Sequence, residues 1–318
     1  MKINLAQSAG FCSGVKRAID IALATAGKGK KVCMLGDIVH NEDVVKEIKK
    51  AGIKKISSLA NGNNTTLLIR AHGSSIKIMK QAKNLGYSII DATCPMVKEI
   101  HRIVREMETA GYTIIVIGDT KHDEVHGIIG QLKKPAVVIQ DIDHIPWKRI
   151  HPIQKACVVS QSTQNIKKVT AIVSCLKKHI PRVSFYNTIC RPTRIKQAEM
   201  ESMPLENDLM IIIGSKTSAN TKRLYELSRE LNAKSYWVSS KKDINLKWLQ
   251  GGCRVGITAG ASTPQHDPRD SRLSHKTKIT IPLFIYLSLS GLPLYANWQS
   301  PPAALLPAGY LRRQNKGF

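Results

Sequence analysis

The sequence is poor in aromatic and acidic residues. Aromatic side chains make up 5% of its 318 residues, and 23 aspartates and glutamates stand against 48 lysines and arginines, so the net charge is +25. The basic residues form short runs without interleaved aromatics or a nucleic-acid reader motif. We therefore expect a basic surface that attracts acidic partners or a small anionic substrate. A nucleic-acid-binding protein is the less favoured alternative.

The N-terminal segment lacks the long apolar stretch and the small-residue cleavage site of a signal peptide. This absence predicts a cytoplasmic protein, in which disulfides are rare. The chain has seven cysteines, an odd number. Metal binding, catalysis or plain burial must then account for them, although no CxxC signature is present.

Short apolar runs alternate with helical patterns along most of the chain, which predicts an α/β fold with mostly parallel sheets covered by helices. The runs expected as strands are residues 31–35, 66–69, 87–90, 113–117, 157–159, 209–213 and 255–258. Nearly every run leads directly into polar residues. Because ligands of such sheets lie beyond the carboxyl ends of the strands, we expect one composite site built from several loops.

The chain divides into three α/β units of comparable length, although residue identity shows no obvious repeat. The predicted units are residues 1–94, 95–190 and 191–264. Residues 265–318 lack this alternation of strands and helices and contain no glutamate, so they read like the product of a shifted reading frame. They include an apolar stretch that is interrupted by Pro282, Gly291 and Pro293. These interruptions argue against a membrane span. We expect this tail to be disordered or to lower the stability of the protein.

Three cysteines differ in setting from the other four. Cys12, Cys94 and Cys190 each stand just before an expected helix, and a helix N-terminus favours the thiolate that metals require. Their wide spacing by itself supports a shared metal cluster only weakly. The remaining cysteines lie in apolar strand or helix patterns, where a thiol usually acts as a small buried hydrophobic group; they are Cys33, Cys157, Cys175 and Cys253.

Three histidines follow apolar strands in a similar way. They are His40, His72 and His122. Any one of them could be an ordinary structural histidine, but three at equivalent strand ends suggest donors directed at one anion. The pair His122 and His126 is four residues apart, yet its sequence matches neither common zinc-protease motif, so a zinc site is not favoured.

The sequence also contains two candidate phosphate loops and a candidate acid. Two segments follow expected strands: GSKTSAN, which contains Ser218, Ala219 and Asn220, and GAS, which contains Ser262. Backbone N–H groups and polar side chains in such loops can hold a phosphate. Either segment could equally be a capped turn. Glu124 could donate a proton if burial raises its pKa, although it could also be a solvated carboxylate.

Taken together, these segments resemble the LytB family, the 4-hydroxy-3-methylbut-2-enyl diphosphate reductases. The resemblance extends from Met1 to about Pro264 and rests on many motifs in a fixed order: AGFCSGVKRAI, GDIVHNEDVV, IRAHGSS, DATCPMV, HDEVHGIIGQ, SQSTQ, NTICRPTRIKQ, GSKTSANTKRL and GITAGAST. It implies three α/β units around a central [4Fe-4S] cluster with one iron open to substrate. It also implies reductive removal of a hydroxyl group, giving isopentenyl and dimethylallyl diphosphates.

The resemblance assigns roles to individual residues. The implied cluster ligands are Cys12, Cys94 and Cys190. The implied diphosphate ligands are His40, His72, His122, Ser218, Ala219 (through its backbone), Asn220 and Ser262. Glu124 would be the proton donor, supported by Ser162 or Thr163, and a ferredoxin or flavodoxin would supply electrons. Ser162 and Ala219 depart from the usual family residues, and we expect both departures to be tolerated. The tail departs further, so a degenerate, non-catalytic relative is the alternative.

Overall fold

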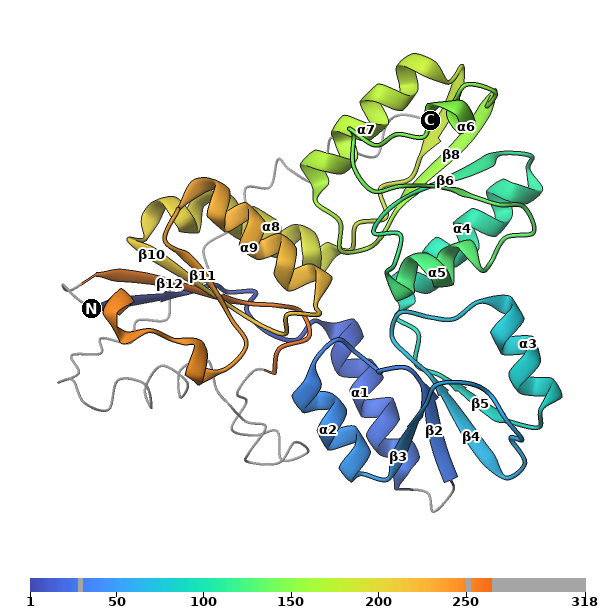
Figure 1. The fold of residues 1–318 in the computed structure, drawn as a ribbon, viewed down its shortest axis with the longest axis horizontal. Helices are drawn as coiled ribbons and strands as arrows, with labels where there is room; N and C mark the ends of the chain where they lie inside the picture. The colour runs from blue at the N-terminus through green and yellow to red at the C-terminus, as the bar shows by residue number, and fades with distance from the viewer. Residues whose placement is uncertain (28–30, 250–252, 265–318) are drawn as a thin grey trace, which may run out of the picture.

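The computed structural model describes residues 1–27, 31–249 and 253–264, which form three lobes around a common centre (Figure 1). Each lobe contains a parallel four-stranded sheet. The first sheet has the order β3-β2-β4-β5 and the second β7-β6-β8-β9. The third has the order β1-β12-β10-β11, which is the same arrangement read from the other edge. The predicted α/β class is therefore confirmed.

The strands are short and closely similar in length. Those of the first sheet are β2 (Lys31–Leu35), β3 (Ile53–Ile56), β4 (Thr65–Ile69) and β5 (Ser88–Asp91). Those of the second are β6 (Thr113–Ile117), β7 (Val137–Ile139), β8 (Lys155–Ser160) and β9 (Arg182–Phe185). Those of the third are β10 (Leu209–Ile213), β11 (Ser235–Val238), β12 (Arg254–Ala259) and the N-terminal β1 (Lys2–Leu5).

The N-terminal strand completes the sheet of the C-terminal lobe. β1 pairs in parallel with β12, with Ile3 opposite Val255. β1 thus occupies in the third sheet the edge that β5 and β9 occupy in the other two. The division into units therefore differs from the predicted one at one place. Residues 2–5 precede the first lobe in the sequence, but they form a strand of the third sheet. The chain path closes into a ring of three equivalent units.

Helices cover both faces of the first two sheets, whereas the third sheet has its α-helices on one face and a 3-10 turn on the other. The helices that start the three units are α1 (Ser13–Ala26), α4 (Pro95–Thr109) and α8 (Arg191–Glu206). The helices that follow the first inner strands are α2 (Glu42–Lys50), α5 (Asp123–Ile129) and α9 (Ala219–Leu231). The others are α3 (Ile76–Asn84), α6 (Trp147–Ile150) and α7 (Ile166–His179), with short 3-10 turns at Lys241–Asp243 and Leu246–Leu249. None of the helices in the described part is long and apolar enough to cross a membrane.

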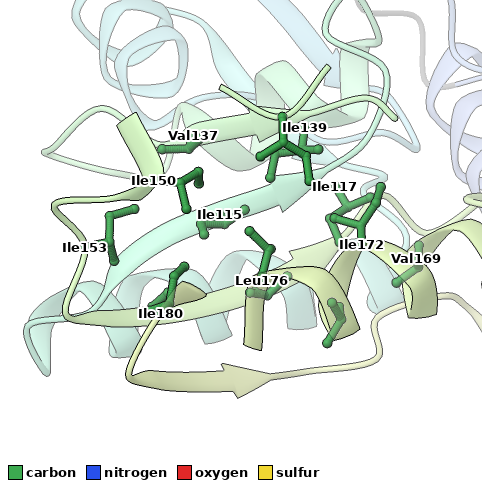
Figure 2. Packing of buried hydrophobic residues seen from close by; sticks show 14 of the residues in the cluster. Ile115, Ile117, Val137, Ile139, Ile150, Ile153, Val169, Ile172, Leu176 and Ile180 are labelled. Carbon is green, nitrogen blue, oxygen red and sulfur yellow. The ribbon is translucent and has the colours of Figure 1, made fainter. Parts of the chain in front are cut away.

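The second sheet shows how alternating side chains build two cores. Ile115 and Ile117 of β6 point to one face, where they pack with Ile172 and Leu176 of α7 (Figure 2). Ile114 and its alternate neighbours point to the opposite face, against residues of α4 and α5. A strand buried on both faces needs an unbroken apolar run, which is why the inner strands were recognisable in the sequence.

Replacing Ile115 by alanine should leave a cavity in a core that is fully closed to solvent, since its side chain is 0% exposed. We expect the free energy of unfolding to fall by about 2–5 kcal/mol, measured by urea denaturation followed by circular dichroism. Ile142→Ala is the matched control, because Ile142 is 44% exposed. Equal losses in the two variants would contradict the packing described.

Candidate functional site

Three cysteines stand at the same structural position in the three units. The edge strands β1, β5 and β9 each lead into a cysteine that caps the next helix: Cys12 caps α1, Cys94 caps α4 and Cys190 caps α8. Each thiol therefore lies at the positive end of a helix dipole. The three lobes that these helices begin are arranged around a common centre (Figure 1).

Close contacts confirm that these cysteines are neighbours. A Cβ atom added at Gly14 would lie 2.6 Å from the Sγ of Cys94 and 3.9 Å from the Sγ of Cys12. The thiols of Cys12 and Cys190 interact electrostatically with one another. Gly14 thus allows α1 to approach Cys94, and Cys12 lies near both of the other cysteines. This donor set fits an iron–sulfur cluster, which proteins bind through cysteine thiolates.

Burial affects two of the thiols more strongly than the helix ends do. Burial raises the pKa of the Cys94 thiol, and it raises the pKa of Cys190 to about 11. Backbone N–H groups at the helix starts lower both pKa values, as expected, but burial has the larger effect. A bound metal reverses this balance, because a coordinating thiol is deprotonated outright. Two of the ligands would lose their protons on binding metal.

The three histidines form a compact cluster beside the cysteines. His40 follows β2, His72 follows β4, and His122 follows β6 and caps α5. Their ring centroids are 4.4 Å apart for His40 and His72, 5.1 Å for His40 and His122, and 5.4 Å for His72 and His122. Loops of two different sheets thus bring the rings together. His126 is directed away, with its Nε2 2.8 Å from the carbonyl oxygen of Thr120.

The nitrogen atoms of the three histidines lie within 4.8 Å of one another, a spacing that would also suit a metal ion. Burial is the main cause that lowers the pKa of all three rings, to about 4 for His122 and well below the usual value for His72. The positive charge of Arg70 also lowers the pKa of His72. At His40 the charge of Asp123 has a larger effect than that of Arg70 and raises the pKa. Neutral imidazoles can bind a metal ion or donate a hydrogen bond to an anion.

The third lobe contributes hydrogen-bond donors to the same region. Ser218 caps α9, and Ala219 and Asn220 form its first turn. The Ser262 hydroxyl donates to the carbonyl oxygen of His40 at 2.9 Å, which joins the second loop of this lobe to the histidines. In the part of the chain that the structure describes, four buried side-chain nitrogen atoms have no hydrogen-bond partner: His40 Nε2, His72 Nδ1, His101 Nε2 and Asn220 Nδ2. Such atoms fit a polyanionic ligand, since buried polar groups need partners.

Glu124 is a buried acid held by Ser162. Its carboxylate is 2% exposed and accepts hydrogen bonds from the Ser162 amide at 2.5 Å and the Ser162 hydroxyl at 2.8 Å. Burial raises its pKa, and the bonds from Ser162 oppose that rise only in part. Thr163 accepts a hydrogen bond from Gln161 instead, at 3.1 Å. Of the two residues expected to support Glu124, Ser162 is the one in contact.

Three polar contacts between lobes surround the site, and sequence reasoning missed them. Arg70 donates two hydrogen bonds to Asp123, at 2.6 and 2.9 Å, between the first and second lobes. Arg223 binds Asp119 at 2.8 Å between the third and second lobes. Glu42 accepts a 2.7 Å bond from Ser215 between the first and third. Each contact lies within a few residues of a candidate ligand, but single charges in loops give no signal of their partners.

We expect the His122 imidazole to be neutral at pH 6.5, because burial lowers its pKa to about 4. Exposed His144 should be largely charged at that pH, since the carboxylate of Asp141 raises its pKa. Nitrogen-15 NMR of labelled histidine rings would measure both titrations, with His122→Asn and His144→Asn assigning the signals. A His122 ring that is mostly protonated at pH 6.5 would contradict the burial described.

The sequence matches the protein family described as LytB protein over residues 3–269. A relative from Trichlorobacter lovleyi, a 4-hydroxy-3-methylbut-2-enyl diphosphate reductase, is 38% identical over 266 residues, covering 83% of this chain and 94% of that protein. A reductase of the same name from Anaplasma marginale is 35% identical over 272 residues, covering 83% of this chain and 79% of that protein.

Solved structures show the same similarity. One is a structure of (E)-4-hydroxy-3-methyl-but-2-enyl diphosphate reductase, the terminal enzyme of the non-mevalonate pathway. It aligns with a TM-score of 0.62 and 34% identity over 83% of this chain and 95% of that chain. The structure of the Plasmodium falciparum reductase aligns with a TM-score of 0.76 and 28% identity, over 83% of this chain and 84% of that chain.

Proposed function

The chain belongs to the LytB family, and we infer that it is the oxidoreductase that converts 4-hydroxy-3-methylbut-2-enyl diphosphate to isopentenyl and dimethylallyl diphosphates. This reaction is the last step of the non-mevalonate isoprenoid pathway. The carbon–oxygen bond to the hydroxyl group breaks, two electrons and two protons are taken up, and water leaves. The alternative of a non-catalytic relative is not favoured, because the similarity covers 83% of the chain and every proposed site residue is present.

The observation that carries this proposal is the meeting of three chemically different groups at one junction. Cys12, Cys94 and Cys190 supply sulfur, the histidines and the α9 loop supply anion donors, and Glu124 supplies a proton. Cys190 joins two of these groups, because its amide donates to the carbonyl oxygen of Ser162 at 3.0 Å. An allylic diphosphate with a hydroxyl at its other end offers a matching partner for each group.

Cys12, Cys94 and Cys190 would hold one [4Fe-4S] cluster, with one iron lacking a cysteine ligand. When bound, this cluster supplies single electrons and a Lewis-acidic position for the substrate hydroxyl. The protein would provide the cysteine thiolates at three helix N-termini and would enclose the cluster between its three lobes. The tail expected to affect stability lies outside the described residues.

The diphosphate would be bound by the donors that lack partners. His40 Nε2, His72 Nδ1 and Asn220 Nδ2 provide buried donors, if the two ring nitrogens carry their protons. His122, Ser218, Ser262 and the backbone N–H of Ala219 complete the set. Two features favour phosphate here: the start of α9 presents free amides, and neutral histidines can gain protons when an anion binds.

Glu124 would deliver the proton to the leaving hydroxyl group. Its raised pKa keeps more of the side chain protonated than an exposed glutamate would be. Ser162 fixes the carboxyl orientation through two hydrogen bonds. Thr163 stays in the proposed set as a neighbour of Gln161 and makes no contact of its own with the acid.

The electron donor would be an acidic ferredoxin or flavodoxin. The net charge of +25 favours association with an acidic carrier, because complementary charge speeds encounter. No nucleic-acid partner and no membrane association are proposed, and a cytoplasmic location stays a prediction.

The proposed function is tested by anaerobic purification, iron and sulfide analysis, and assay of the hydroxylated diphosphate with a reduced low-potential donor. We expect about four irons per chain and turnover that Cys94→Ser abolishes. Cys175→Ser is the matched control, because Cys175 lies in α7 away from the site and should keep both iron and turnover. Full turnover by Cys94→Ser would overturn the assignment.

Glu124→Gln should lower kcat by about 10²–10⁴-fold, the usual contribution of a general acid, while iron content stays unchanged. Glu201→Gln is the control, since the Glu201 side chain is 60% exposed on α8. The pH dependence has a definite sign. The active acid is protonated, so wild-type kcat should be highest below the raised pKa of Glu124 and fall as pH increases through it. A kcat in Glu124→Gln equal to that of the wild type would rule out this role.

A further inference from the structure

One lysine is buried as completely as the apolar core. Lys196 lies in α8, six residues after Cys190, and is 2% exposed. Lysines rarely lose all contact with water unless their charge is compensated, because transfer of an ammonium group from water is costly. The sequence predicted nothing for this residue, since a lysine among the arginines of RPTRIKQ resembles an ordinary exposed helix residue.

The contacts of Lys196 join the segments that carry two of the cysteines. Its Nζ donates to the carbonyl oxygen of Ser8, in the loop that leads to Cys12, and to that of Ala259 at 3.0 Å. The amide of Cys12 in turn donates to the carbonyl oxygen of Ala261 at 3.1 Å. Lys196 therefore ties the start of α8 to the Cys12 loop and to the end of β12.

These contacts do not neutralise its charge. Both hydrogen-bond acceptors are neutral carbonyl groups, and the carboxylate acting on the lysine is that of Glu199, which also accepts a bond from the Ser8 amide at 3.0 Å. Cys12 and Cys190 are the other acidic groups that act on Lys196 electrostatically. Burial lowers its pKa to about 8, so the ammonium form still predominates at neutral pH.

We propose that Lys196 is a positioning residue whose buried charge stabilises the reduced form of the three-cysteine site and so raises its reduction potential. This inference rests on the proposed function, because it requires the cluster that Cys12, Cys94 and Cys190 would hold. Each thiolate brings one negative charge, and the electron accepted from an acidic carrier adds another. A fixed positive charge favours the more negative state, and local charge is one of the factors that set cluster potentials.

The test is a redox titration of the loaded protein, followed by electron paramagnetic resonance, in Lys196→Gln and Lys196→Arg. Glutamine keeps a donor without the charge, and arginine keeps the charge. We expect Lys196→Gln to lower the reduced-to-oxidised ratio at a fixed potential at least tenfold, equivalent to about 59 mV for one electron. Lys196→Arg should stay near the wild-type potential. Lys167→Gln is the control, because it removes the same charge from a side chain that is 67% exposed.

An unchanged potential in loaded Lys196→Gln would overturn the proposal, as would an equal shift in Lys196→Arg. If Lys196→Gln assembles no cluster, Glu199→Gln decides the question, because it removes the carboxylate that offsets the lysine charge. The proposal predicts a shift to more positive potential there, and no shift or a negative shift would overturn it. The titration uses no substrate, so a loaded protein with the expected shifts but without turnover would count against the proposed function alone.

Discussion

The structure depends on one geometric constraint, which is that three parallel sheets direct the carboxyl ends of their strands at a common junction. The same edge strand in each sheet, β1, β5 or β9, is followed by a loop that leads to a cysteine at a helix N-terminus. No single lobe could supply all three cysteines from this position, so the proposed site exists only when all three units are assembled. The N-terminal strand links two lobes covalently, because β1 lies in the third sheet and the chain then continues through Cys12 into the first lobe.

Burial shifts the pKa values of the ionisable side chains around the junction. Exclusion of water lowers the pKa of His72 and His122, which favours their neutral forms, and raises the pKa of Glu124. Neutral histidines can then gain protons when an anion binds, and in the proposed reaction a protonated Glu124 would donate to the leaving hydroxyl group. Arg70, Arg223 and Lys196 add fixed positive charge near the ligands. The contacts Arg70–Asp123, Arg223–Asp119 and Glu42–Ser215 each join two lobes, so the closure of the site and its electrostatics rest on the same residues.

The sequence predicted the inner strands well because these are apolar on both faces, as in LMIII of β10 and TIIVI of β6. It missed β1, β3, β7, β9 and β11, which lie at sheet edges, are short, and often carry charged residues, as in IKKI of β3. The cysteines, histidines and Glu124 were identifiable because each follows a strand. Which of them meet, and that Ser162 and not Thr163 holds Glu124, depends on loop conformations that local patterns do not encode. Lys196 could not be predicted, because its burial results from contacts with residues 63 and 188 positions away.

We propose that three cysteines from three lobes hold a four-iron cluster whose fourth iron is left to the substrate. Mössbauer spectroscopy of the iron-57-enriched protein, recorded without and with the hydroxylated diphosphate, tests this claim most directly. The account predicts a four-iron cluster in which the signal of one iron in four changes on addition of substrate, while the other three stay as they are. Four equivalent irons that do not respond to substrate, or a cluster with fewer irons, would contradict it.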